Sequence, residues 1–211
     1  MNIEKIEYGN FDEIDFLSPM FTQKKNKLRI VVRLDSSLSV WSSNIPNIVS
    51  SINDLLQECK EQDCIFSKYP SETNYDHSFD KDLSDLPNIM EHIILGLIYK
   101  ISKVRDGSGL TCLLNGDTNL YNIFIECDDP QLGEFAVMAA KNLMEDVLVH
   151  GDRSPLWSYL IDMAAFIYPA SINDIADKKL GSWLGWSKPE TDLALNTLKS
   201  LSFFHNYSGI A

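Results

Sequence analysis

The stretch that most constrains the fold runs from residue 86 to 102 and reads LPNIMEHIILGLIYKIS. Ser84 or Asp85 can cap a helix here, and Pro87 belongs in its first turn, where a missing N–H costs little. A helix so rich in apolar residues has to be covered by other layers of the protein. Its apolar side chains recur at helical spacing, which predicts a buried stripe made of Met90, Ile93, Ile94, Leu97, Ile98 and Ile101.

Three polar residues stand at the start of this helix. Asn88 and His92 are four residues apart and share a helical face, with Glu91 beside them. We expect the three to sit together at one rim of the domain, opposite the apolar stripe. They are ordinary polar residues of a first turn, with Glu91 favoured by the helix dipole, or they form a variant of the zinc motif H-x-x-E-H in which Asn88 stands at the position of the first histidine. In that motif two imidazoles bind the metal and the glutamate takes a proton from the metal-bound water.

Strands and helices are indicated on both sides of this helix. The expected elements are a β-branched strand at 28–34, a helix at 44–62 capped by Asn44 or Ser43, a hairpin at 110–127 around Asn115-Gly116-Asp117, and a helix at 130–150 with small residues suited to close packing. This order predicts an α+β fold, in which a small mixed or antiparallel sheet is packed by helices in two layers. The domain should span residues 1–150.

Two segments lie outside this pattern. Residues 65–85 are polar, carry Tyr75 and His77, and are expected to form a long surface loop of the kind that often serves a function. After HGDRSP, interpreted as a linker with turn chemistry, residues 151–211 are helical in character. Ser187 and Glu190 form a capping box there. The outline resembles a helix-turn-helix, which we expect to serve docking or self-association.

The charge of the chain limits the classes of molecule that it can be expected to bind. The net charge is −12 and the pI about 4.6, and residues 151–211 carry five Lys and Arg against six Asp and Glu. This balance argues against nucleic acid, which needs several cationic contacts to phosphate. One basic spot stands out and is either a solvated surface or a ligand site; it contains Lys24, Lys25, Lys27 and Arg29, with Arg33 nearby.

The remaining composition favours a cytoplasmic protein. No apolar run is long enough for a membrane span, and no secretory signal is visible at the N-terminus. The four cysteines are scattered, without a C-x-x-C pair, which favours reduced thiols over a disulfide framework or a zinc ribbon.

Four stretches resemble, in order and spacing, the N-terminal domain of cyanophycin synthetases: KNKLRIVVRLD, SNIPNIVSSINDLL, LPNIMEHIILGLI and NLYNIFIECDDPQLGEFAVMAAKNLMEDVL. The likeness covers roughly residues 24–150. In that family the domain precedes ATP-grasp and Mur-ligase-like domains and is thought to hold the growing aspartate–arginine polymer. This sequence has no phosphate loop of the type GxxxxGK[ST], so we do not expect it to make polymer alone.

The resemblance also implies roles for single residues. Some family members look like hydrolases with a metal on H-x-x-E-H; by that likeness Glu91 would be the general base, His92 a metal ligand and Glu126 the third ligand. Asn88 departs from the pattern where the family has histidine. Arg105 remains from an arginine-containing stretch that follows the helix in the family.

The function expected from these observations is a non-catalytic binding or accessory protein that holds a peptide-like polymer or a partner ligase. It would need no cofactor. One alternative is a zinc-dependent peptidase on N-x-x-E-H, with His77 as a substitute ligand. Another is a helix-turn-helix regulator. Binding residues would come from the basic spot, from Arg105, and from Tyr75 and His77 of the polar loop. A homo-oligomer fits the helical C-terminal segment.

Overall fold

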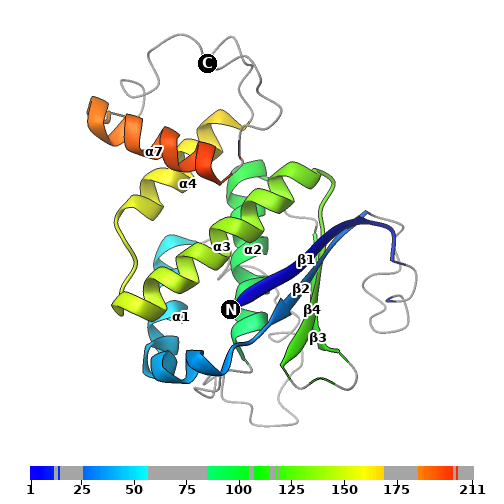
Figure 1. Ribbon diagram of the computed structural model, residues 1–211. Coiled ribbons are helices and arrows are strands. Elements are labelled where there is room, and N and C mark those ends of the chain that lie inside the picture. Colours follow the sequence, from blue (N-terminus) through cyan, green and yellow to red (C-terminus); the bar gives the residue numbers. More distant parts are fainter. Residues whose placement is uncertain are drawn as a thin grey trace, which may run out of the picture.

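The computed structural model describes residues 1–11, 14, 26–56, 85–104, 107–114, 117, 119–168, 185–201 and 203. A four-stranded sheet lies on one side of the molecule and the helices pack against one of its faces (Figure 1). This is the predicted α+β architecture. The predicted polar loop at 65–85 lies outside the described residues, apart from its last position, and so do residues 169–184 of the C-terminal segment that was expected to be helical.

The sheet has the strand order β1-β2-β4-β3, and every neighbouring pair is antiparallel. In the register Ile30 pairs with Ile123, and Thr111 pairs with the same Ile123 from the other side. The predicted strand and hairpin are therefore confirmed. The strands are β1 (Asn2–Gly9), β2 (Lys27–Arg33), β3 (Gly109–Leu113) and β4 (Leu120–Glu126).

Strand β1 was not predicted. Its sequence NIEKIEYG carries charges at Glu4, Lys5 and Glu7, which masks the alternation that usually marks a strand. The structure places it at one edge of the sheet, where charged side chains protect an edge from pairing with other chains.

The two faces of the sheet differ. Alternate residues of the central strands enter the main core under the helices; they are Leu28, Ile30, Val32, Ile123 and Ile125. The opposite face holds Phe124, which packs with Ile14 and meets the ring of Phe11 at 5.7 Å between centroids. Side chains at alternate positions of β4 therefore point either into the main core under the helices or toward the opposite face of the sheet.

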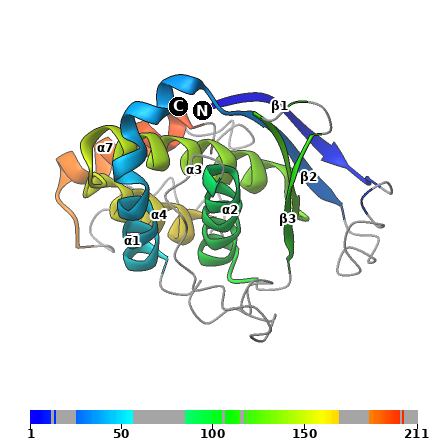
Figure 2. The same cartoon turned by 90° about the horizontal axis from the view of Figure 1, so that it is seen from below.

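Helix α2 (Leu86–Ser102) is the predicted central helix, and all six residues of its expected apolar stripe are buried. It begins after Asp85, one of the two predicted N-cap positions, but the Asp85 side chain makes no capping hydrogen bond. The helix ends where Lys103 turns into the left-handed conformation with φ 62°. Figure 2 shows α2 between the sheet on one side and α1 and α4 on the other. This position explains why the helix is buried on nearly every side.

Helix α3 (Pro130–His150) covers the sheet next to α2. Asp129 caps it by accepting hydrogen bonds from Gln131 N and Leu132 N. Close packing depends on Gly133, where a Cβ would lie 3.2 Å from Cys127 Sγ. The three alanines expected to allow close packing, Ala136, Ala139 and Ala140, are buried, and so is Gly133.

Helix α1 (Ile45–Leu55) follows a 3₁₀ helix, η3 (Ser36–Asn44), that was not predicted. Pro46 lies in the first turn of α1. The Asn44 side chain, expected to cap this helix, instead donates to Leu148 O at 2.8 Å, and Asn47 donates to Gly151 O at 2.8 Å. Two amides, one at the end of η3 and one in the first turn of α1, therefore bind the backbone at the C-terminal end of α3.

The C-terminal helices are α4 (Leu156–Ile167) and α7 (Lys188–Ser200), and α7 starts with the predicted capping box of Ser187 and Glu190. Their buried residues belong to the same core as α2 and α3. One direct contact joins Phe203 to Phe135 of α3, with centroids 4.7 Å apart. The described part of the C-terminal segment thus packs against α2 and α3 of the same chain. In the described ranges, no helix combines the length and apolarity needed to cross a membrane.

Candidate functional site

Glu91 points from α2 toward strand β3 and is only 6% exposed. Thr111 Oγ1 donates to its Oε2 at 2.5 Å. Gly109 makes room for the carboxyl group, because a Cβ at that position would come within 2.4 Å of Oε1. Burial raises the pKa of Glu91 to about 7, although the hydrogen bond from Thr111 acts in the opposite direction. The expectation that Glu91 lies at a rim opposite the core is therefore wrong, because this residue faces the sheet.

His92 and Asn88 are half-buried on α2. Burial lowers the pKa of His92, which favours the neutral imidazole. A neutral imidazole is the form that ligates metals, so His92 alone is compatible with the predicted role.

Glu126, the expected third ligand, is separated from these residues by the sheet. Its neighbour Ile125 pairs with Gly109 on the face that Glu91 contacts, so by alternation Glu126 belongs to the opposite face with Phe124. Its Oε2 accepts from Ser108 N at 3.1 Å. Within the described ranges no three His, Cys, Asp or Glu residues form a group that could hold a metal ion. The zinc-peptidase hypothesis stays a prediction, and its substitute ligand His77 lies outside those ranges.

The described residues of the basic spot are buried in the sheet or pair with other residues of the chain. Lys27 is fully buried. Arg29 donates to Asn122 Oδ1 at 3.1 Å and pairs with Glu7 at 3.3 Å. Arg33 binds Glu4 and, at 2.7 Å, Asp117, which raises the pKa of its guanidinium. These contacts serve strand packing, and the other expected binding residues fall outside the described part of the chain: Lys24, Lys25, Tyr75, His77 and Arg105.

A polar cleft of about 690 Å³ lies between α1 and the turn that joins α3 to α4. One sign of this cleft in the sequence, which was not predicted as a site, is a polar stripe with helical spacing along α1. The turn itself was interpreted only as a linker. We call this space the α1–turn cleft; its lining consists of Asn47, Ser50, Ser51, Asp54, Gly151, Asp152, Arg153, Pro155, Ser158 and Tyr159.

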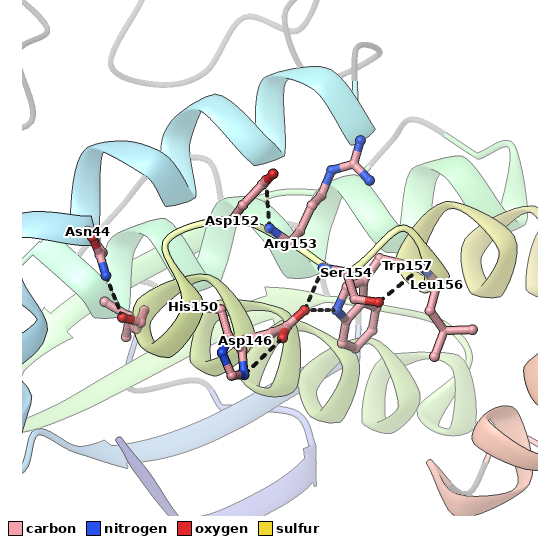
Figure 3. A network of polar contacts seen from close by, with 9 residues as sticks. Asn44, Asp146, His150, Asp152, Arg153, Ser154, Leu156 and Trp157 are labelled. Carbon is pink, nitrogen blue, oxygen red and sulfur yellow. Dashed lines mark hydrogen bonds and ion pairs between the residues drawn. The ribbon is translucent and has the colours of Figure 1, made fainter.

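The turn at the floor of the α1–turn cleft is held in place by Asp146 of α3 (Figure 3). Its Oδ2 accepts from Ser154 N at 2.7 Å and from Trp157 Nε1 at 3.1 Å. His150 Nε2 lies 3.8 Å from Oδ1 of the same carboxylate. Gly151 ends α3 with φ 78°, a conformation that favours glycine. The turn is therefore a fixed structure rather than a flexible linker.

Arg153 extends from this turn toward α1, as Figure 3 shows. Its Nη1 donates to Ser158 Oγ at 3.1 Å. The carboxylate of Asp152 accepts the backbone N–H of Arg153 at 2.7 Å and so is engaged with the main chain. The α1–turn cleft combines one guanidinium, two carboxylates and several hydroxyl groups, which suits a ligand with both charges and many hydrogen-bonding groups.

Replacing Asp146 with alanine should lower the free energy of unfolding by about 1–3 kcal/mol, because two N–H donors would lose a charged acceptor. Urea unfolding followed by tryptophan fluorescence measures this change. Asp162→Ala is the matched control, since Asp162 is exposed on α4 and lies 4.0 Å from Lys100. An equal and small effect of both substitutions would show that Asp146 does not hold the turn.

The α1–turn cleft and the buried carboxylate of Glu91 are thus two places in the described structure where chemistry could occur. The carboxylate is enclosed between α2 and β3, whereas the cleft is open to solutes. Comparison with protein-family models, curated sequences and solved structures finds no match to this chain.

Proposed function

We propose that this chain is a non-catalytic binding protein that holds a peptide-like polymer in the α1–turn cleft. The observation that carries the proposal is the cleft itself, whose volume of about 690 Å³ lies in the range of ligand sites in proteins. Its lining comes from two helices and a turn that is fixed by hydrogen bonds, so a ligand would meet a preformed surface.

Chemical character supports a peptide-like ligand. Asp54 and Asp152 can accept amide, ammonium or guanidinium groups, and Arg153 can bind a carboxylate. The serine and tyrosine hydroxyls can meet peptide carbonyls. The resemblance to the cyanophycin synthetase N-domain suggests a chain of aspartate and arginine, which offers both charges in alternation. We also propose that this chain acts in the cytoplasm and cooperates there with a separate ligase.

Calorimetric titration with a blocked oligopeptide of alternating aspartate and arginine tests the proposal. We expect saturable binding that Ser50→Trp weakens at least about tenfold, because the indole would fill the cleft that Ser50 lines. Ser43→Trp is the matched control, since Ser43 is an exposed serine of η3 outside the cleft lining.

Two results would contradict the proposal. One is the absence of saturable binding to the wild-type chain. The other is equal affinity of the Ser50→Trp, Ser43→Trp and wild-type proteins, which would place the ligand elsewhere on the surface.

A further inference from the structure

The arginines of the described structure fall into two classes. Arg29 and Arg33 pair with carboxylates of the chain itself. Arg153 donates to the hydroxyl of Ser158, and in the described ranges no carboxylate lies within ion-pair distance of its guanidinium. In a chain with a net charge of −12, a cleft guanidinium without a carboxylate partner is a conspicuous exception.

We infer that Arg153 receives a carboxylate of the bound chain, so that the α1–turn cleft selects an acidic side chain flanked by a hydrogen-bond donor. This inference rests on the proposed function, since it names the group that enters the same cleft. A guanidinium presents five N–H donors in a planar fork, which matches the two oxygens of a carboxylate. Ser158 Oγ accepts from Nη1 and thereby fixes the orientation of the fork.

The turn that carries Arg153 is held in one conformation, which favours selective binding of a carboxylate over general charge attraction. Its backbone N–H is held by Asp152, and the next residue, Ser154, is held by Asp146. The guanidinium is therefore carried by a turn whose conformation is set before a ligand arrives, which reduces the ordering cost of binding.

The α1 side of the cleft determines which ligand group can lie next to the carboxylate that Arg153 binds. Asp54 is exposed on α1 and lines the same cleft. A ligand carrying only negative charge would be repelled by Asp54 and Asp152, whereas a donor or cation beside the carboxylate would be attracted to them. The ligand class is therefore a zwitterionic peptide segment rather than a purely acidic one.

Two blocked dipeptides test this inference: acetyl-Asp-Arg-amide and acetyl-Asn-Arg-amide, which differ only in one carboxylate. We expect the wild-type protein to prefer the Asp peptide by about tenfold. Arg153→Gln should bind both peptides with equal affinity, and Arg153→Lys should recover only part of the preference because lysine lacks the fork. Lys199→Gln, which removes a charge from the exposed last turn of α7, should keep the full preference.

The outcomes separate the two claims. If the wild-type protein binds both dipeptides equally well, or if the preference survives in Arg153→Gln, the role of Arg153 is overturned while the binding function stands. If neither dipeptide nor the longer oligopeptide binds, the proposed function fails and the inference fails with it. Thermal unfolding of Arg153→Gln and Arg153→Lys confirms that each variant is folded.

Discussion

Replacing Glu91 with glutamine is expected to raise the free energy of unfolding at pH 8 by about 3 kcal/mol and to change it little near pH 4. The carboxyl group is 6% exposed and its pKa is raised from 4.5 to about 7. Between pH 4.5 and about pH 7 the carboxyl group of Glu91 therefore stays protonated in the folded protein, whereas it is ionised in the unfolded chain. Wild-type stability should fall as the pH rises from about 4.5 to 7 and should then level off. Glutamine carries no charge and can still bond to Thr111, so this contribution should vanish.

Urea unfolding of both proteins at several values between pH 4 and pH 8 measures the effect, because the difference between them cancels the titration of all other groups. His92, whose lowered pKa gives a contribution that is lost as the pH falls, is common to both proteins and cancels in the same way. Glu134→Gln serves as control, since Glu134 is exposed on α3. A stability difference between Glu91→Gln and wild type that does not change with pH would show that Glu91 is not a buried titrating group.

Alanine at Gly109 is expected to lower the free energy of unfolding by about 2 kcal/mol through overpacking. The new Cβ would lie 2.4 Å from Oε1 of Glu91 and 2.8 Å from its Cδ and Cγ. Helix α2 packs on β3 at this point, and the carboxyl group is enclosed there, so it has little room to move away.

A double-mutant cycle isolates this contact. In a Glu91→Ala background, Gly109→Ala should cost less than in wild type by about 1–2 kcal/mol, because its clashing partner is gone. Gly9→Ala is the matched control: a Cβ at Gly9, also at the end of an edge strand, would meet no atom within 4 Å. If Gly109→Ala costs the same with and without the Glu91 side chain, the described approach of α2 to β3 is wrong.

The parts of the fold that follow from local rules could be predicted from the sequence. The core stripe of α2 follows from helical periodicity, and the β3–β4 hairpin follows from two apolar strands around a turn. The start of α7 follows from the paired Ser187 and Glu190. In each case the determining residues are close together in the chain, so no knowledge of the tertiary structure is needed.

The parts that depend on distant segments could not be predicted. Strand β1 is stabilised by pairing with β2, and its charged residues hide the alternation until that partner is known. A helical projection places Glu91 among the polar residues at the surface, but Gly109, 18 positions later, provides the space for the Glu91 side chain to face the sheet. The α1–turn cleft likewise combines Asp54 with Arg153, which no sequence spacing brings together.

The position of the ligand is the most direct test of the central claim that this chain binds a peptide-like polymer in the α1–turn cleft. Amide chemical shifts of ¹⁵N-labelled protein, recorded during titration with the aspartate–arginine oligopeptide, report that position residue by residue. Our account predicts that the shifts cluster at the cleft residues of α1 and at those from Gly151 to Tyr159. Shifts confined to the N-terminal end of α2 or to the sheet, with the cleft amides unchanged, would contradict it.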